Sequence, residues 1–491
     1  MKIGVEQSKN IGFCFFEVAK ANPDFPAVIS EQSRVSYWQL WQLVESFALA
    51  MKKKGVGQGS LVALNTTDML VSLASLLATS LLGAEFVVAG KQLANTRDLS
   101  PTHFFRSSEV SGSAAVKFDL IGRSWLPKPE SKPVSPSDTF EGYRDSEQPW
   151  LNLHTSGSTG VPKYLNLSQR IVFDRTEAIK PDFPTQETVM ATVFPFTSRP
   201  FYARAIGALL NTCTIVDSYS LQAWTSLGVN LVCGSPSQLL KVFSNVNQKP
   251  KIERLEVSGD KLSDADAKTF FKSFETVIDI YGASETNKTF ANIISLNEYG
   301  AIVATGKPLD TRIEIVDDAG KPCPAGSSGT VRVQNGYMIS GYLHSNRQSD
   351  PAFRDGWFYP GDIGTWGPRG ELQILGRQDE ILNLGGIKIN AALVDSLICS
   401  VEGVKDAACF KNPKTDGPAE ILAFAVLDKD YDRQSVLDEA LELCKSKLGV
   451  VLAPRRIRVI DQIPKSAGGS PQRDACQKIL LDHIGQAPKP V

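Results

Sequence analysis

The chain has no pair of cysteines spaced C-x-x-C, and neither sign of charge prevails. The cysteine pattern therefore predicts neither a zinc site nor a redox dithiol, and we expect buried, reduced thiols. Lys plus Arg number 52 against 53 Asp plus Glu, so no global field would draw the chain to nucleic acid or to anionic lipid. Any basic binding surface must be local. The cysteines stand at positions 14, 213, 233, 323, 399, 409, 444 and 476.

A long transmembrane run is also lacking. The segment from Met69 to Ala84 carries no charge, but it is shorter than a membrane span and lies between Asp68 and Glu85. We expect a buried helix there, between "SLVALNT" and "EFVVAG", in a β-α-β unit with a parallel sheet. The N-terminal patch "IGFCFFEVAK" contains Glu17 and no small-residue cleavage site, so it predicts no secretory signal. These absences favour a cytoplasmic protein.

What the chain does have is length and an α/β alternation. Its 491 residues, 42% of them hydrophobic, exceed one ordinary core, so a large domain and a smaller one are expected. From Asn152 to about Ile280, short apolar runs alternate with helix-like segments. Between Ile302 and Leu375, strand-like runs separated by glycine turns predict an antiparallel or barrel-like subregion. A fresh α/β pattern follows it.

We therefore place a domain boundary near Asp379. The predicted fold class is α/β. A large N-terminal domain at 1–378 would consist of layered mixed sheets with helices and the barrel-like β subregion, and a small α/β C-terminal domain would occupy 379–491. The clearest helix follows Ser36, because Gln39 completes a capping box and Gly55 ends the apolar periodicity. The Pro- and Ser-rich stretch 127–149 predicts an exposed loop.

One loop has the composition of a phosphate cradle. The stretch from Leu153 to Lys163 reads "LHTSGSTGVPK"; glycines let backbone N–H groups turn inward, hydroxyls add donors and the lysine adds positive charge. The spacing is not that of Walker A, because Gly157 and Gly160 are three apart and Pro162 precedes the lysine. Taken alone, the loop also fits an ordinary glycine-rich surface turn.

Four further segments follow that loop in order. "DIYGASET" at 279–286 comes after an apolar strand-like run, which places Tyr281 and Glu285 at a strand-to-loop exit, where ligand sites of α/β proteins lie. "GWFYPGDIG" at 356–364, "GRQDEILNLGGIKI" at 376–389 and "IPKSAGGSPQR" at 463–473 complete the series. The series resembles the adenylate-forming superfamily of acyl-CoA synthetases, amino-acid adenylation domains and firefly luciferase. The resemblance extends over nearly the whole chain.

The resemblance implies an ATP site, and physical chemistry agrees with it. Tyr281 would lie along the adenine, and Asp279 would accept a hydrogen bond from its exocyclic amine. Glu285 would hold Mg²⁺, which prefers oxygen ligands and phosphate partners. Asp362 would accept both ribose hydroxyls, with Arg377 beside it. The remaining implied ATP contacts are Thr155, Ser156, Gly157, Ser158, Thr159, Gly160, Lys163, Gly259, Asp260, Gly282 and Ser284. The alternative is a buried tyrosine with surface ion pairs.

The family's reaction has two steps. A carboxylate attacks the α-phosphorus of ATP to give acyl-AMP and pyrophosphate, and a thiol then takes the acyl group. The protein contributes position and charge neutralisation. The resemblance also implies that the small domain is mobile and rotates about Asp379 between the steps, with Gly385 and Gly386 along the thiol channel. The implied catalytic residues are Thr159, Lys163, Glu285, Lys465 and Ser470.

Ser470 departs from the family pattern. The last motif normally carries a lysine at this position, and a serine cannot neutralise negative charge that develops during adenylation. Three explanations stay open: Lys465 or another lysine takes over, adenylation is slow, or the chain binds nucleotide without turnover. A substitution made in the laboratory is a further possibility. Asn383, Leu393 and "FYPGD" are smaller departures.

The acid substrate is less well defined by the sequence. The resemblance puts one wall of the acid pocket in "FPFTSRPFYARAIGALL", with Phe196, Ser198 and Arg199, and adds Ser235. Thr197 and Ser198 stand where adenylation domains anchor an α-amine with aspartate, which disfavours an amino acid. Arg199 and Arg204 would meet a second carboxylate or a polar substituent of the acid, or would be solvated or paired with surface acids. Aromatic residues permit an aryl or short acyl acid.

The acceptor would be CoA or a separate phosphopantetheinyl carrier protein. A basic run from 445 to 478 would suit either partner or simply be solvated. We therefore expect an acid–thiol ligase that uses ATP and Mg²⁺. The rival is a catalytically impaired relative that binds nucleotide or acyl groups.

Overall fold

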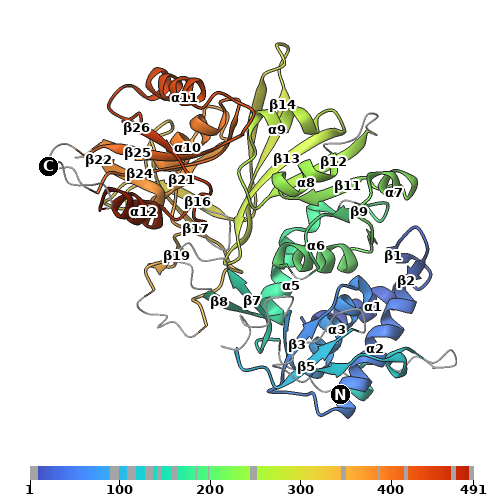
Figure 1. Cartoon of the computed structure of the whole chain (residues 1–491). Coiled ribbons are helices and arrows are strands. Elements are labelled where there is room, and N and C mark those ends of the chain that lie inside the picture. The colour runs from blue at the N-terminus through green and yellow to red at the C-terminus, as the bar shows by residue number, and fades with distance from the viewer. Residues whose placement is uncertain are drawn as a thin grey trace.

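The computed structural model describes residues 9–88, 99–107, 118–127, 136–140, 146–155, 163–183, 185–196, 198–243, 251–343, 350–384, 387–413, 419–465 and 471–485. Within these ranges the chain forms a large N-terminal unit of two sheets and their helices, a smaller β subregion and a C-terminal α/β unit (Figure 1). The fold class predicted from the sequence is confirmed.

A mixed nine-stranded sheet forms one layer. In spatial order the strands are β15 (Ile302–Pro308), β14 (Asn287–Leu296), β13 (Phe274–Ala283), β12 (Ile252–Ser258), β11 (Leu231–Gly234), β9 (Val189–Thr192), β10 (Thr214–Val216), β1 (Pro26–Ile29) and β2 (Arg34–Ser36). Its central strands run parallel, with a helix connecting β9 to β10, β10 to β11, β11 to β12 and β12 to β13, and antiparallel strands close both edges.

A six-stranded sheet forms the second layer. All its pairs are parallel except the last, where the two strands that flank the predicted phosphate loop run antiparallel. In order the strands are β6 (Asp119–Leu120), β5 (His103–Arg106), β3 (Leu61–Asn65), β4 (Glu85–Val88), β7 (Pro149–Thr155) and β8 (Lys163–Ser168). The predicted β-α-β unit is confirmed, since β3 and β4 are parallel neighbours.

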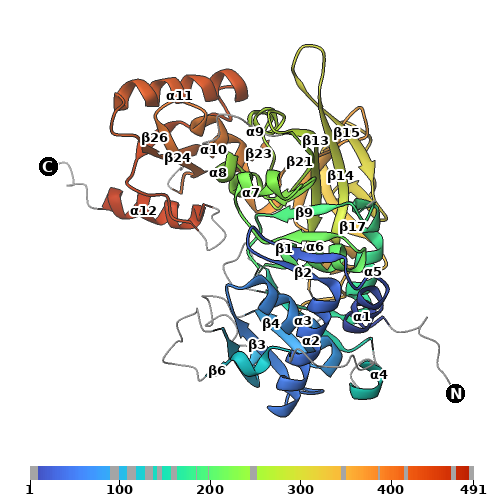
Figure 2. The same cartoon turned by 90° about the vertical axis from the view of Figure 1, so that its right-hand side faces the viewer.

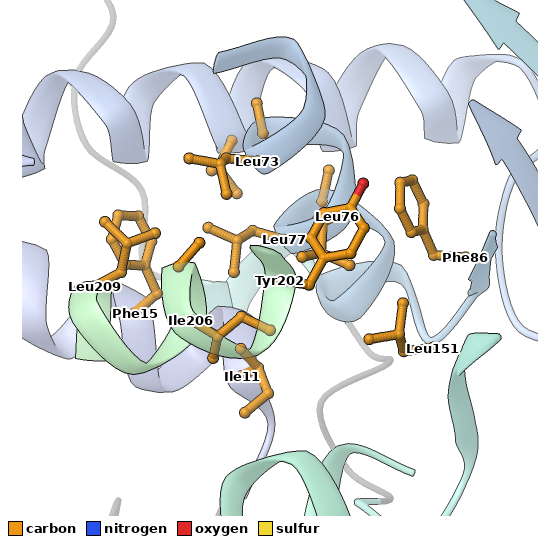
Figure 3. Close-up of a cluster of buried hydrophobic side chains, with 14 of the residues drawn as sticks. Ile11, Phe15, Leu73, Leu76, Leu77, Phe86, Leu151, Tyr202, Ile206 and Leu209 are labelled. Atoms are coloured by element: carbon orange, nitrogen blue, oxygen red, sulfur yellow. The ribbon is translucent and has the colours of Figure 1, made fainter. Parts of the chain in front are cut away.

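Helices pack on both sheets around two cores, a large one and a smaller one. Figure 3 shows Phe15, Leu77 and Ile206 packed together from three helices, with Leu151 contributed by a strand. The helices of this unit are α1 (Ile11–Ala21), α2 (Tyr37–Lys53), α3 (Met69–Leu82), α4 (Pro136–Thr139), α5 (Gln169–Ala178), α6 (Arg199–Leu210), α7 (Leu221–Ser226), α8 (Pro236–Phe243) and α9 (Asp264–Phe270), with 3₁₀ turns at Arg123–Trp125 and Lys180–Asp182. The large core includes α1, α2, α3, α5 and α6, and the smaller one includes α7, α8 and α9.

Two of these helices were predicted from local signals. α2 begins after Ser36, whose side chain and that of Gln39 form a capping box, and Gly55 adopts a φ of 88° after its end. α3 is buried along nearly its whole length and ends at Gly83 in the left-handed conformation. Among the described residues, no helix combines the length and the hydropathy that crossing a bilayer requires.

The β subregion is antiparallel, as expected, but it begins later than predicted. β15 pairs with β14 in the nine-stranded sheet and is not part of the subregion. The subregion itself contains β16 (Arg312–Val316), β17 (Gly329–Gln334), β18 (Phe353–Arg354), β19 (Trp357–Phe358), β20 (Asp362–Trp366) and β21 (Leu372–Arg377). Alternation of apolar residues predicts a strand but does not say which neighbour it joins, and this explains the error.

The C-terminal elements form a group of their own at one end of the molecule (Figure 2). A 3₁₀ turn at Gln378–Glu380 leads into them, and the buried residues of their cores begin at Leu384. The elements are β22 (Ile381–Leu384), β23 (Ile387–Asn390), α10 (Ala391–Cys399), β24 (Val404–Lys411), β25 (Ile421–Leu427), α11 (Arg433–Leu448), β26 (Arg456–Val459) and α12 (Arg473–Gly485).

Two expectations about exposure need correction. The stretch 127–149 is not simply an exposed loop: its described part includes the short helix α4, and the Phe140 ring is only 2% exposed because it packs into the main core. Cys399 is exposed rather than buried, and Cys14 and Cys323 are partly buried. The other five cysteines are buried as predicted, and all eight are free thiols.

Candidate active site

The ends of four parallel strands gather most of the residues predicted to bind nucleotide and acid. β9, β11, β12 and β13 run in the same direction, so their carboxyl ends meet at one edge of the sheet. The residues there include Phe196 beyond β9, Ser235 directly after β11, Gly259 and Asp260 directly after β12, and Tyr281 near the end of β13. The topology thus brings together segments that are far apart in the sequence.

Tyr281, Asp362 and Arg377 form one hydrogen-bonded group at this edge. The Tyr281 hydroxyl donates to Asp362 Oδ2 at 2.6 Å, and Arg377 Nη1 donates to Asp362 Oδ1 at 3.3 Å. Arg377 Nη1 also donates to the Pro360 carbonyl at 2.6 Å. Burial and the neighbouring Asp362 carboxylate raise the pKa of Tyr281 well above its ordinary value. The three residues implied for adenine and ribose therefore lie together, and both carboxylate oxygens of Asp362 accept hydrogen bonds from the other two side chains.

Asp279 lies two residues before Tyr281 on the same strand. Burial raises the pKa of its carboxyl from 3.8 to about 6, partly opposed by a hydrogen bond with Asn292, its partner on β14. A carboxyl group in this position accepts hydrogen bonds in either protonation state. Its location is compatible with the role implied for it beside the adenine.

Glu285 sits in the tight turn between β13 and β14 and is 6% exposed. Its Oε1 accepts a hydrogen bond of 2.7 Å from the Tyr342 hydroxyl. Burial and the Glu285 carboxylate raise the pKa of Tyr342, so this phenol is the proton donor. Lys163 Nζ lies 4.6 Å from the centre of the Tyr342 ring. Tyr342, which sequence reasoning missed, thus connects the lysine that follows the phosphate loop to the carboxylate expected to bind metal.

Arg175 fixes the turn that carries Glu285. This side chain on α5 is 5% exposed, and its guanidinium donates to three carbonyl oxygens: those of Ser284 at 3.1 Å, Glu285 at 2.7 Å and Tyr337 at 3.0 Å. Burial, with Arg199 nearby, lowers the pKa of Arg175 well below its ordinary value. A signal was available in the sequence, because Arg175 occupies the buried face of a helix at helical spacing from Val172.

A glycine and an asparagine shape the same turn. A Cβ on Gly282 would lie 2.3 Å from the Asn287 carbonyl oxygen, so a side chain there would displace the backbone. Asn287 adopts a φ of 68° and its side-chain oxygen accepts a hydrogen bond of 3.1 Å from Arg199 Nη2. The turn between β13 and β14 is therefore bonded at Glu285 by Arg175 and at Asn287 by Arg199.

The two arginines proposed to meet a second carboxylate point to different places. Arg204 is 5% exposed, and it contacts Ser258 Oγ at 3.0 Å and the Phe194 ring at 5.0 Å, on the side of the nine-stranded sheet. Arg199 turns toward Asn287 and Glu285; burial, opposed by the Glu285 charge, lowers its pKa to about 10. Of the alternatives for Arg204, solvation is ruled out, because the core of the large unit covers this side chain.

The other implied acid-pocket residues have local partners. The Phe196 ring lies 5.2 Å from Phe201 and 5.9 Å from Tyr219. The Ser198 hydroxyl caps α6 and donates to the Pro195 carbonyl at 2.7 Å. Ser235 Oγ donates to Gln238 Oε1 at 2.9 Å.

Lys465 lies in the C-terminal unit. Its ammonium group pairs with Asp406 Oδ2 at 2.7 Å, with 40% of the lysine side chain exposed. Arg473 of the same motif is structural: it donates to the Cys409 carbonyl at 2.6 Å and to Asp395 Oδ2 at 2.8 Å, and so ties α12 to β24 and α10.

Several predicted residues lie outside the described part of the chain. They are Ser156, Gly157, Ser158, Thr159 and Gly160 of the loop, Thr197, both glycines of the thiol channel (Gly385 and Gly386) and Ser470. Thr155 ends β7 and pairs in register with Lys163 of β8, so the two ends of the loop are adjacent.

The described residues hold no cluster of three or more His, Cys, Asp or Glu side chains that would by itself bind a metal ion. A lone carboxylate such as Glu285 nevertheless fits Mg²⁺, which keeps several water ligands and shares its coordination with phosphate oxygens. A single buried carboxylate near Lys163 is compatible with such an ion.

The chain is similar to several curated proteins and solved structures. The chain is 25% identical to the probable CoA ligase CCL9 of Humulus lupulus, covering 94% of this chain and 95% of that protein. It is 23% identical to the 3-hydroxybenzoate–CoA ligase of Aromatoleum sp. (strain CIB), again over 94% and 95%. The o-succinylbenzoate CoA synthetase MenE of Bacillus subtilis, solved in complex with the acyl-adenylate OSB-AMP, has the same fold, with a TM-score of 0.81 at 20% identity over 95% and 98%.

Two family models match the chain in the order of its two units. The model of the AMP-binding enzyme covers residues 15–343, and that of the AMP-binding enzyme C-terminal domain covers residues 393–469. The first includes the loop before Lys163, the Glu285 turn and Tyr342, and the second includes Lys465. Motif order, fold and both models therefore agree, and the chain belongs to the AMP-binding enzymes of the adenylate-forming superfamily.

Proposed function

We propose that the protein uses ATP and Mg²⁺ to activate an aryl or short acyl carboxylic acid as its acyl-AMP and then transfers the acyl group to a thiol. The observation that carries the proposal is the placement of Glu285, Tyr342 and Lys163 beside one another, at the edge where Tyr281 and Asp362 lie. The first group suits the phosphates and the second suits the nucleoside. Membership of the family supports both roles.

In the first half-reaction an oxygen of the carboxylate forms a bond to the α-phosphorus, while the bond from that phosphorus to pyrophosphate breaks. Lys163 neutralises phosphate charge. Two neighbours position Glu285: the Tyr342 hydroxyl bonds its carboxylate, and the Arg175 guanidinium bonds its backbone carbonyl. Bound Mg²⁺ supplies the further positive charge that makes pyrophosphate a good leaving group. The chain itself works mainly by positioning.

The nucleoside end of the site requires a small rearrangement. Both Asp362 oxygens accept protein hydrogen bonds, one from Tyr281 and one from Arg377. Ribose hydroxyls would compete for the same oxygens, so we expect the Tyr281 ring to stay against the adenine while its hydroxyl gives up Asp362.

The acceptor is proposed to be CoA, with a phosphopantetheinyl carrier protein as the alternative. The names of the two relatives in the comparison, both CoA ligases, support CoA. For transfer, we propose that the C-terminal unit turns about Asp379, in the 3₁₀ turn that joins β21 to β22. This hinge and the domain limits 1–378 and 379–491 rest on the family resemblance and on the separate cores of the two units.

The second candidate is a relative that binds nucleotide but adenylates poorly. Ser470 favours it, because the family lysine at that position would supply charge near the α-phosphate. Lys465 is the described lysine of the same motif, and it is engaged with Asp406. An ion pair this exposed is weak, so Lys465 remains free to exchange partners.

The test is acid-dependent exchange of labelled pyrophosphate into ATP. The protein is incubated with ATP, Mg²⁺ and pools of aliphatic, aromatic and dicarboxylic acids, beside the Ser470→Lys variant. Exchange by the unaltered chain supports the ligase and names the acid once the pool is resolved. Confirmed ATP binding without exchange, together with exchange by Ser470→Lys, would establish the impaired relative instead. Thioester formation with CoA or with a carrier protein then identifies the acceptor.

A further inference from the structure

A small cavity lies between α5, α6 and the β7–β8 pair, next to the turn of Glu285. Its wall is largely apolar and includes Leu151, Leu167 and Ile206. Its polar lining consists mainly of Arg175, Arg199 and Asn287. The cavity has a volume of about 20 Å³, enough for one small group but not for a nucleotide.

The donors around this cavity are not all satisfied. Arg175 has three carbonyl acceptors. Arg199 has one described acceptor, Asn287 Oδ1, and its Nε is fully buried with no hydrogen-bond partner among the described residues. A buried donor that bonds to nothing is costly, and a buried guanidinium costs more. Among the described residues, this corner of the core therefore offers no acceptor to Arg199 Nε.

The cavity also lacks negative charge. Two arginines contribute to its lining, and none of the described lining residues is acidic. The nearby Glu285 carboxylate already accepts from Tyr342 through Oε1, and Arg204 turns away toward Ser258. A water molecule would supply an acceptor for Nε, but the two guanidinium groups would then share the single nearby carboxylate of Glu285 as their compensating charge. An anionic group satisfies both requirements.

We propose that this cavity is a binding site for one small monovalent anionic group, a halide ion or a carboxylate, with Arg199 as its principal donor and Arg175 as the second positive charge. The group comes either from solution or from the acid substrate, as a second carboxylate. Assignment to the substrate rests on the proposed function, whereas the anion site itself does not.

The first test needs no turnover. The thermal midpoint of the full chain is measured while bromide, or in a second series acetate, replaces gluconate at constant ionic strength. A saturable rise of roughly 2–4 °C is expected for the unaltered protein. The rise should vanish in Arg199→Met and in Ala203→Leu, which fills the cavity while keeping both charges. It should persist in Arg170→Met, where an arginine of the same helix α5 pairs with Asp174 outside the cavity.

A crystal soaked in bromide provides a second measurement if those variants fail to fold. An anomalous peak within hydrogen-bond distance of Arg199 Nε supports the site. No saturable rise in the unaltered protein, or the same rise in a folded Arg199→Met, overturns it.

The source of the group is settled by a second set of reactions. Pyrophosphate exchange is compared for matched mono- and dicarboxylic acids. A preference of about tenfold or more for the dicarboxylic acid, lost in Arg199→Met and competed by bromide, assigns the group to the substrate. A bromide effect that is equal for both acids assigns it to solution. Absence of exchange with every acid would count against the proposed function, while the bromide titration would still decide the anion site.

Discussion

The Tyr342 hydroxyl donates a hydrogen bond of 2.7 Å to Glu285 Oε1 across 57 positions of the sequence. Both side chains are buried, at 7% and 6% exposure. The contact makes a residue with no motif of its own part of the candidate metal site, and it defines the first prediction.

Tyr342→Phe removes the donor and leaves a buried carboxylate. We expect the free energy of unfolding to fall by about 1.5–3 kcal/mol, the usual contribution of a hydrogen bond to a charged group. Urea unfolding measures it. The matched control is Tyr337→Phe, whose hydroxyl donates to the neutral Asp310 carbonyl at 2.8 Å and should cost about 1 kcal/mol. Equal losses of unfolding free energy in both variants would mean that the charge of Glu285 does not strengthen its hydrogen bond with Tyr342.

Arg175→Met should affect the metal requirement of the reaction as well as stability. The substitution leaves three carbonyls without their donor, including that of Glu285. We expect a loss of about 3 kcal/mol or more in the free energy of unfolding. In the folded fraction, we also expect a several-fold rise in the Mg²⁺ concentration that half-saturates pyrophosphate exchange.

Arg170→Met is the control for Arg175→Met, because its partially exposed side chain pairs with Glu147 and Asp174. Arg170→Met should change little in either the free energy of unfolding or the Mg²⁺ concentration that half-saturates exchange. If Arg175→Met lost stability but kept the Mg²⁺ dependence of the unaltered chain, Arg175 would be a purely structural residue.

Asp279 makes stability depend on pH in a defined direction. Its pKa is raised from 3.8 to about 6 in the folded chain, so the folded state holds this proton more tightly than the unfolded state does. The ionised carboxylate therefore destabilises the folded state. This loss of stability is complete once the pH is well above 6, and it disappears as the pH falls toward 4. We expect Asp279→Asn to stabilise the protein at pH 7 by at most about 3 kcal/mol, with the difference vanishing near pH 4.

Urea unfolding of both forms between pH 4 and 8 tests the Asp279 prediction. Since asparagine keeps an acceptor for the adenine amine, the affinity for ATP should change little. A stability difference that does not vary with pH would contradict the assigned pKa shift.

Lys465→Met tests whether this lysine does the work that the family assigns to the position of Ser470. We expect pyrophosphate exchange to fall by roughly 10²–10³-fold. The free energy of unfolding should change by less than about 1 kcal/mol, because the pair with Asp406 is partly exposed. Lys445→Met, which removes an exposed pair with Glu442, is the control. Unchanged exchange in Lys465→Met would show that another group supplies the charge.

Local sequence signals predicted much of the fold. Ser36 and Gln39 mark the start of α2 because a capping box is satisfied within one helical turn. The run from Met69 is a buried helix because it is apolar all round. The partners of strands were less predictable: β15 joins β14 rather than the β subregion, since alternation does not encode a neighbour.

The sequence by itself determined the α/β class, the order of the motifs and the family, because these depend on residues that are close along the chain. Tertiary structure alone decided that Tyr342 reaches Glu285 and that Arg175 bonds a carbonyl 110 positions away. It alone separated Arg199 from Arg204 and left the Nε of each without a hydrogen-bond partner among the described residues. The physical reason is that a hydrogen bond requires two groups within about 3 Å, and only the packing of the helices between the two sheets sets such distances.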